Sequence, residues 1–422
     1  MSAGTADGGD MRMPSYARAL RSREFFGLYL ARVLSDWGDQ LARVAIAALV
    51  LHRSGSAFFA AAVFAVSFLP KVFGQALLGP YADRLPRRTL MVGCDVLRAA
   101  ALTLLVVAVI RGMSTAGLLV LLFFVELAGA PFFAASRALL TELFHERALY
   151  LRASSLMQMS FQFNQVAGVA LGGVVVAALG ADRALWVDAA TFAVSGVLIA
   201  AFVRPRPAAS DGGVPGVRDL VDDVRIGIAY LRTDVSLRAL MLLAWLMLLV
   251  FIAPEAVALP YAASHGASTA AGGLLLAASP FGAFVSVLVI SRWQPVVQVR
   301  RLVLLAMCVP VPLLVLAIAP PWPVAVVLFF LAGAFQGFMV PLMATFSLLS
   351  PDHLRGRLSA LAGSGFALVS AVAFVVVGAL SDATSPAFAV VLAAAATLLV
   401  LVVVRLRWPQ QQLCAAAERA YA

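Results

Sequence analysis

The chain has 422 residues, of which 63% are hydrophobic and 12% charged, and its formal net charge is +10. Ordinary globular domains are about 45–50% apolar and about 25% charged. Because many of the apolar runs are long enough to cross a ~30 Å hydrocarbon core as a helix, the composition predicts an integral membrane protein and excludes a soluble fold.

The first 23 residues are polar and basic, and the apolar run that follows is too long for a secretory signal peptide. We therefore expect a tail over residues 1–23, followed by twelve membrane-spanning helices. The expected spans are residues 24–51, 56–79, 89–110, 115–141, 153–180, 184–203, 236–262, 269–291, 301–319, 323–349, 358–380 and 386–405.

Arginines are distributed unequally between the two sets of loops. One set, together with both ends of the chain, carries 23 arginines, whereas the opposite loops carry Arg53, Arg111 and Arg183. By the positive-inside rule, both termini are expected in the cytoplasm. The positive charge then reflects topology and attraction to anionic lipid rather than binding to nucleic acid. Lys71 is the only lysine, which is typical of a GC-rich bacterial genome and favours the bacterial inner membrane as the location.

The stretch GPYADRLPRR, at residues 79–88, places four charges and two prolines between the second and third apolar runs. Proline disfavours a continuous helix, and arginine is costly inside the bilayer. We therefore expect this stretch to form a cytoplasmic hairpin.

The chain changes character after the sixth span. The Pro/Gly/Ser-rich stretch RPRPAASDGGVPG precedes apolar residues at helical spacing with charged residues between them, which predicts an amphipathic helix at the membrane surface. We expect a six-helix half over residues 24–203, a linker over 204–235, a second six-helix half over 236–407 and a tail over 408–422.

The two expected halves share a weak repeat. Residues 127–156 align with residues 331–361, and within them Arg152 matches Arg357. An internal repeat of this kind is typical of secondary transporters, whose substrate site lies near the midplane between the halves.

With twelve expected spans around it, the 79–88 hairpin resembles the signature loop of the major facilitator superfamily. That signature runs Gly, three residues, Asp, Arg, one residue, Gly and two basic residues. The chain supplies Gly79, Asp83, Arg84, Arg87 and Arg88, with Pro86 in place of the second glycine. SDWGDQLARVAIAALVLHRSGSA, DRLPRRTLMVGCDVLRA, DVRIGIAYLRTDVSLRALM and PDHLRGRLSAL resemble the enterobactin-exporter and macrolide-efflux branch. The resemblance implies an all-α membrane fold of twelve helices in two pseudo-symmetric halves.

The fifth span partly matches a motif that antiporters of this superfamily carry. Gly168, Gly172 and Gly173 occupy motif positions, but Asn164 replaces the first glycine and Val169 replaces the proline. The resemblance favours export. The alternative is ordinary close packing of helices through small residues.

The resemblance also implies a role for the hairpin. Asp83 is expected to point at the partly positive N-terminus of the eleventh span. We expect Asp95 and Arg98 of the third span to join Asp83 and Arg87 or Arg88 in a network that closes the cytoplasmic side. The alternative is that these charges only fix the topology.

Ionisable residues inside the first span need a reason to lie there, because charge is costly in the membrane. Arg32 and Asp36, like Asp39 and Arg43, are four residues apart and are expected to pair. A structural ion pair and a role in ion coupling are both open for these residues.

Glu126 lies near the middle of the fourth span, with no charged residue three or four positions away. A carboxyl group buried without a partner binds a proton readily, so Glu126 is the first candidate for proton coupling. Glu255, between Pro254 and Pro260 in the seventh span, is a second candidate for coupling or for binding a cationic substrate. Asp188 is interpreted as structural, because the resemblance places the sixth span at the periphery.

Amide side chains and walls of aromatic residues and methionine suit varied amphipathic substrates, because such walls can repack. Packing inside the protein or against lipid is the alternative for each residue. The expected cavity residues are Trp37, Arg43, Gln158, Gln162, Gln165, Phe335, Gln336 and Met339.

The sequence contains no G-x-x-x-x-G-K-[ST] loop, no pattern of a catalytic triad and no cluster of metal ligands. We therefore expect no enzymatic activity, no cofactor and no metal. The predicted function is secondary active transport by a monomer, which exports a small amphipathic drug, antibiotic, siderophore or peptide in exchange for protons by alternating access. Two alternatives stay open: an importer or facilitator on the same fold, and a membrane sensor or assembly partner that transports nothing.

Overall fold

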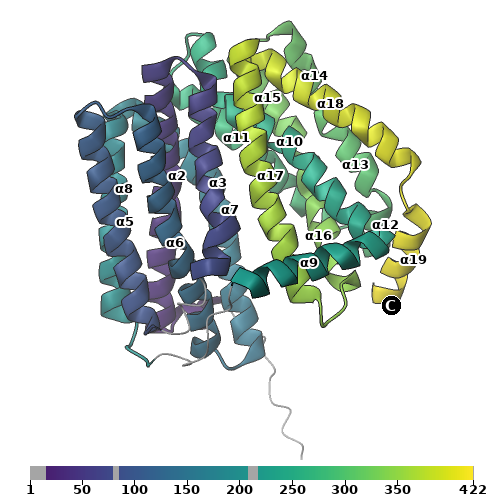
Figure 1. Cartoon of the computed structure of the whole chain (residues 1–422), viewed down its shortest axis with the longest axis horizontal. Coiled ribbons are helices and arrows are strands. Elements are labelled where there is room, and N and C mark those ends of the chain that lie inside the picture. The colour runs from purple at the N-terminus through teal and green to yellow at the C-terminus, as the bar shows by residue number, and fades with distance from the viewer. Residues whose placement is uncertain (1–15, 79–84, 208–216, 422) are drawn as a thin grey trace, which may run out of the picture.

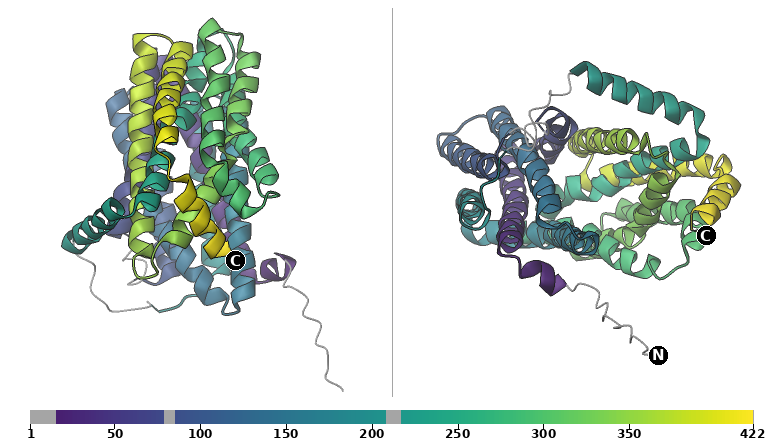
Figure 2. Two further views of the ribbon diagram at one scale, coloured as in Figure 1. Left: turned by 90° about the vertical axis from the view of Figure 1, so that its right-hand side faces the viewer. Right: turned by 90° about the horizontal axis from the view of Figure 1, so that it is seen from below.

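The computed structural model describes residues 16–78, 85–207 and 217–421. Throughout these ranges the ordered elements are helices, and the long ones stand side by side in two bundles (Figure 1). The view from below shows the two bundles next to each other (Figure 2). The expectation of an all-α membrane fold of twelve spans in two halves is confirmed.

The first bundle consists of long, unbroken helices. A short helix, α1, precedes them, and hydroxyl caps set several of their starts. For example, Ser22 accepts a hydrogen bond from Phe25 N at the start of α2, and Gly55 ends that helix with φ of 65°. The elements are α1 (Tyr16–Leu20), α2 (Arg23–Ser54), α3 (Ala57–Leu78), α5 (Arg87–Ile110), α6 (Thr115–Leu143), α7 (Arg147–Leu179) and α8 (Ala181–Phe202).

The second bundle contains both long helices and broken ones. Its elements are α10 (Val235–Ser264), α11 (Thr269–Ile290), α12 (Pro295–Arg300), α13 (Leu302–Cys308), α14 (Pro310–Leu314), η1 (Val315–Ile318), α15 (Trp322–Gly333), η2 (Gln336–Phe338), α16 (Met339–Leu349), α17 (Arg355–Ala383) and α18 (Pro386–Leu406). Two further helices lie outside the spans. α9 (Val217–Thr233) crosses the lower end of the molecule in Figure 1, and α19 (Gln410–Tyr421) follows α18.

Two of the expected continuous spans are divided. The ninth, expected over 301–319, consists of α13, α14 and η1, because proline at 310 and 312 supplies no backbone N–H for a continuous helix. The tenth, expected over 323–349, is interrupted by η2. There Gly337 N donates to Ser286 Oγ of α11 at 3.1 Å, so a neighbouring side chain replaces the lost helical hydrogen bond.

Length and hydropathy agree with a multi-pass membrane protein. Within the described ranges, nine helices are long and apolar enough to cross a bilayer. Shorter apolar stretches cover Ala57–Pro70 and Leu302–Ile318. α2 is 32 residues long, and buried charges interrupt its apolar surface.

The two bundles are joined at the end of the molecule opposite to α19, the upper end in Figure 1. Asp382 at the end of α17 accepts hydrogen bonds from Ala57 N at 2.6 Å and Phe58 N at 3.2 Å, at the start of α3. Further along the same two helices, the rings of Phe64 and Phe374 stack at 5.3 Å. A second contact joins α7 to α11, described below. The upper end is therefore closed by direct contact between the halves.

Candidate functional site

A cavity of about 220 Å³ lies within the first bundle. Residues from α2, α5, α6 and α7 line it, together with Pro70 of α3. Its walls combine phenylalanine rings and amides with six charged side chains. The charged residues are Arg32, Asp36, Asp39, Arg43, Arg98 and Glu126.

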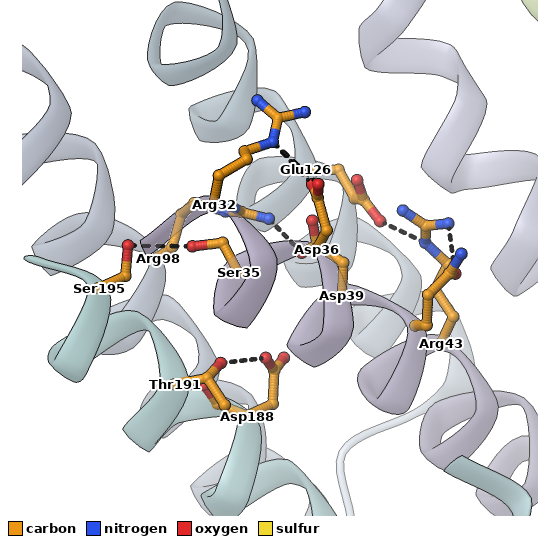
Figure 3. Close-up of polar contacts among 11 residues, drawn as sticks. Arg32, Ser35, Asp36, Asp39, Arg43, Arg98, Glu126, Asp188, Thr191 and Ser195 are labelled. Carbon is orange, nitrogen blue, oxygen red and sulfur yellow. Dashed lines mark hydrogen bonds and ion pairs between the residues drawn. The ribbon is translucent and has the colours of Figure 1, made fainter. Parts of the chain in front are cut away.

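The six charged side chains of the cavity form three ion pairs (Figure 3). Arg32 Nε lies 2.9 Å from Asp36 Oδ1 within α2. Arg43 Nε of α2 lies 3.0 Å from Glu126 Oε1 of α6. Arg98 of α5 pairs with Asp39 of α2. Pairing of this kind offsets much of the cost of burying a charge in a membrane protein.

The pairing corrects one expectation about these residues and adds to another. Glu126 does have a partner, Arg43, which comes from another helix and therefore lay beyond a search of neighbouring positions in the fourth span. Asp39 and Arg43 interact electrostatically, as expected, but the closer ion pairs join Asp39 to Arg98 and Arg43 to Glu126. Arg43 also donates to Gln40 Oε1 at 2.9 Å. The expected pair of Arg32 and Asp36 is confirmed.

Two further carboxyl groups lie behind the cavity wall. Asp95 of α5 is fully buried, and its Oδ2 accepts from Ser195 Oγ of α8 at 2.6 Å. Asp188 of α8 is 1% exposed, and its Oδ1 accepts from Thr191 Oγ1 at 3.1 Å. Among the described residues, Asp95 Oδ1 and Asp188 Oδ2 have no hydrogen-bond partner. These two acids form a second polar layer around Arg98, whose guanidinium interacts electrostatically with both.

Asp188 was interpreted as structural from sequence alone, but it faces the polar cluster rather than the periphery. Asp188 and Thr191 pack directly against Gly38 of α2, where a side chain would collide with them. A signal was present in the sequence: Asp188, Thr191 and Ser195 fall on one helical stripe of an otherwise apolar span.

The hairpin residues Gly79, Asp83 and Arg84 lie outside the described residues. Arg87 pairs with Glu142 of α6 and donates to Ala138 O at 2.9 Å. Arg88 donates to Ala200 O of α8.

The expected network of Arg87 or Arg88 with Asp83, Asp95 and Arg98 stays a prediction, because Asp83 lies outside the described residues. Asp95 and Arg98 turn toward α8 and α2 in the middle of the first bundle, whereas Arg87 and Arg88 bind α6 and α8 near the start of α5.

The three motif glycines of α7 allow close helix contact on two sides. Gly168 and Gly172 lie against Gln40 and Leu41 of α2. Gly173 instead meets Gly273 of α11, and a Cβ atom on Gly173 would lie 2.6 Å from the Gly273 Cα atom. The motif therefore serves packing within the first half and the contact between halves at the closed end.

Few of the expected cavity residues line this cavity. Arg43 and Gln165 do, and Trp37 packs beside Gly168 on α7. Gln158 and Gln162 are exposed on α7 and are not part of the cavity wall.

The expected cavity residues of the second half lie elsewhere in the fold. Gln336 donates to Ser279 Oγ of α11 at 2.9 Å, and Phe335 and Met339 pack against the apolar core. Sequence reasoning did not select Phe161 or Gln40, which do line the cavity.

Glu255 connects the cluster to the second half. It is half-buried on α10 and interacts electrostatically with Arg43 of α2. Arg43 therefore interacts with acids of both halves, Glu126 and Asp39 from its own half and Glu255 from the other.

Residues 15–420 match the family described as transmembrane secretion effector. The chain belongs to this family of major facilitator superfamily transporters. The match covers both bundles, so it includes the cavity and the cluster around it.

Two curated relatives agree with this family. The chain is 27% identical over 369 residues to the multidrug efflux pump Tap of Mycolicibacterium fortuitum, a match that covers 84% of this chain and 88% of the relative. It is also 27% identical over 226 residues to YkuC of Bacillus subtilis, an uncharacterized MFS-type transporter, and this match spans 52% of each chain.

The fold agrees with a solved transporter structure. The crystal structure of the nucleoside transporter NupG superposes with a TM-score of 0.71 at 13% identity, over 91% of this chain and 99% of the other. At that identity the likeness concerns the fold alone.

Proposed function

We propose that this transporter exports a small amphipathic organic molecule in exchange for protons. The observation that carries the proposal is the cluster of three arginine–carboxylate pairs around one cavity inside the membrane-spanning bundle. Ionisable groups are costly at that depth, and in transporters they mark substrate and proton paths. The similarity to an efflux pump with multiple drug substrates supports export and an amphipathic substrate.

The size of the cavity supports a cycle of conformations. Sites for drug-sized ligands usually occupy about 300–1,000 Å³, whereas this cavity holds about 220 Å³. A bulky substrate would need the halves to move apart along the cavity. With the halves joined at one end, such movement corresponds to rocking of one half against the other.

Arg43 offers a way to couple proton binding to that movement. When Glu126 takes up a proton, it loses its charge and with it most of its attraction for Arg43. The guanidinium of Arg43 is then drawn toward Glu255 of α10, in the second half. Protonation of Glu126 in one half thereby changes the attraction between Arg43 and Glu255 across the two halves. A population shift requires such an interaction, whose strength differs between the conformations.

The distribution of arginines supports an orientation with both termini in the cytoplasm of a bacterium. In that orientation, the end closed by Asp382 faces outward, and the present conformation is closed to the outside. Proton uptake from outside would then require the Asp382 contact to open.

Accumulation of labelled dyes and drugs in a bacterial host that lacks its own pumps tests the proposal. Cells with the wild type are expected to accumulate less of at least one lipophilic cation, and an uncoupler is expected to abolish the difference. Glu126→Gln is expected to abolish it as well. The exposed Arg292→Gln substitution is the matched control and should leave export unchanged.

Each contrary result has a distinct meaning. Greater accumulation in cells with the wild type would show import. Export that survives the uncoupler would exclude proton coupling. No change over a broad panel that includes siderophores and peptides would contradict export of amphipathic molecules and favour a sensor or assembly partner.

A further inference from the structure

The charges of the cluster do not balance. Five carboxyl groups surround three guanidinium groups in the first bundle. The carboxyl groups are those of Asp36, Asp39, Asp95, Glu126 and Asp188, and the guanidinium groups are those of Arg32, Arg43 and Arg98. Each guanidinium is paired with a carboxylate that lines the cavity. The two acids left over, Asp95 and Asp188, are also the two most deeply buried.

Asp188 is the less well satisfied of these two acids. Asp95 accepts a hydrogen bond from another helix at 2.6 Å. Asp188 accepts only from Thr191 of its own helix, at 3.1 Å, and its Oδ2 has no partner among the described residues. In an apolar interior, a carboxylate oxygen without a hydrogen-bond partner favours the neutral carboxylic acid over the charged carboxylate.

The neighbours of Asp188 come from α2, α5 and α6 as well as from its own helix. From α2, Gly38 packs against its carboxyl group and Asp39 acts on it electrostatically. From α5 and α6, Arg98 and Glu126 act on it as well. Arg98 is the single cation among these charged neighbours, and it is already paired with Asp39.

Arg98 interacts electrostatically with both Asp39 and Asp188. Its guanidinium lies 3.9 Å from the centre of the Phe192 ring, and Phe192 is one turn from Asp188 on α8. The face of an aromatic ring attracts a guanidinium, so Phe192 holds the Arg98 guanidinium beside the helix that carries Asp188. Figure 3 shows Arg98 beside Asp39, and Asp188 beside Thr191 of α8, on the other side of the α2 ribbon in that view.

We propose that Asp188 holds a proton in this conformation and passes it to Asp39 during the transport cycle. The proton leaves Asp188 Oδ2 and binds the Asp39 oxygen that Arg98 vacates, while Arg98 moves its ion pair from Asp39 to Asp188. The total charge of the three residues stays the same, so the exchange needs no other ion. Asp39 has 19% of its side chain exposed in the cavity and can release the proton there, which Asp188 cannot do directly.

Infrared difference spectroscopy of the full-length protein in lipid nanodiscs tests where the proton lies. Asp188→Asn is expected to remove one carbonyl band of a protonated carboxylic acid, a band that shifts in deuterium oxide. Asp36→Asn is the matched control, because its carboxylate pairs with Arg32 and should contribute no such band. Loss of no protonated band in the Asp188 variant would overturn the proposal. Asp95→Asn distinguishes Asp95 from Asp188. If the band is lost in the Asp95 variant and kept in the Asp188 variant, the proton lies on Asp95.

The transport step of this proposal rests on proton-driven export, so it needs a readout of its own. Purified protein in proteoliposomes is given a fluorescent lipophilic cation that the wild type exports. Asp188→Asn is expected to lose uphill accumulation driven by a pH gradient and to keep exchange of labelled for unlabelled probe, which requires no net proton movement. Loss of both would indicate a structural role, and retention of both would exclude Asp188 as a proton carrier.

Failure of the two proposals can be told apart. If the wild type transports no probe in response to a pH gradient, proton-driven export fails, while the infrared bands still decide whether Asp188 is protonated. If the wild type is proton-driven and the Asp188 variant keeps its gradient response, only the proposal for Asp188 fails.

Discussion

The two halves of this transporter share a fold but differ in where polarity and irregularity lie. In the first half the long helices are unbroken, and their interior holds a cluster of ionised side chains around a cavity. In the second half two spans are broken into short helices, and the interior is largely apolar, with Glu255 as the acid that reaches the cluster.

The difference suggests that the two halves have different roles in transport. Continuous helices hold charged groups at fixed separations, which ion pairs require, because a buried pair is stabilising only with good geometry. Helices interrupted by proline or by 3₁₀ turns bend more easily. If the proposed function holds, we expect the first half to bind protons and substrate and the second half to move relative to it.

The largest expected effect comes from Arg98→Ala. This change leaves Asp39 buried without its ion-pair partner and removes the one cation near Asp188, at an expected cost of about 3–5 kcal/mol in the free energy of unfolding. Export should be lost. The exposed Arg292→Ala in the second half is the control and should change the free energy of unfolding by less than about 0.5 kcal/mol. Thermal unfolding in detergent measures both, and equal effects would refute the difference between the halves.

The next effect concerns two of the acids that act on Arg43, one from each half. Glu126→Gln is expected to abolish uphill export, a loss of about a hundredfold or more, because general acid–base groups contribute on that scale. Glu255→Gln should lower it less, because it disturbs only the longer-range interaction. Glu126→Gln should also lower the free energy of unfolding, because it removes the ion-pair partner of Arg43. Adding Arg43→Gln should restore the free energy of unfolding but not export. A larger loss with Glu255→Gln would move the coupling site to the second half.

A smaller effect is expected where the halves touch. Gly173→Ala places a Cβ atom 2.6 Å from the Gly273 Cα atom, which has no flexible side chain to move aside. We expect a loss of about 1–3 kcal/mol in the free energy of unfolding, as for other overpacked sites. Gly363→Ala is the matched control, because a Cβ atom on that helical glycine meets no atom within 4 Å. Thermal unfolding compares the two, and equal stability would contradict the close contact.

The smallest effect is expected at Asp382. Asp382→Ala removes the cap that α17 gives to α3, at a cost of about 1 kcal/mol. Ser385→Ala removes a cap of the same kind at the start of α18, within one half, where Ser385 Oγ accepts from Phe388 N at 3.2 Å. Both should lower the thermal stability similarly, but only Asp382→Ala should change the export rate. Equal export rates would show that the contact between halves does not limit transport.

The sequence by itself determined the membrane class, the number of spans and the family resemblance. Long apolar runs can be satisfied in a bilayer only by helices, because each helix pairs its own backbone groups. The pair of Arg32 and Asp36 could also be predicted, because its geometry depends on a single helix and a spacing of four residues.

Only the tertiary structure decided the partners of the other charges. Glu126 and Arg43 are 83 positions apart, and Arg98 and Asp39 are 59 apart, so no spacing within one helix could reveal either pair. The role of Asp188 also depended on which face of α8 meets α2. That choice follows from the packing of whole helices, where Gly38 provides the space that the carboxyl group occupies.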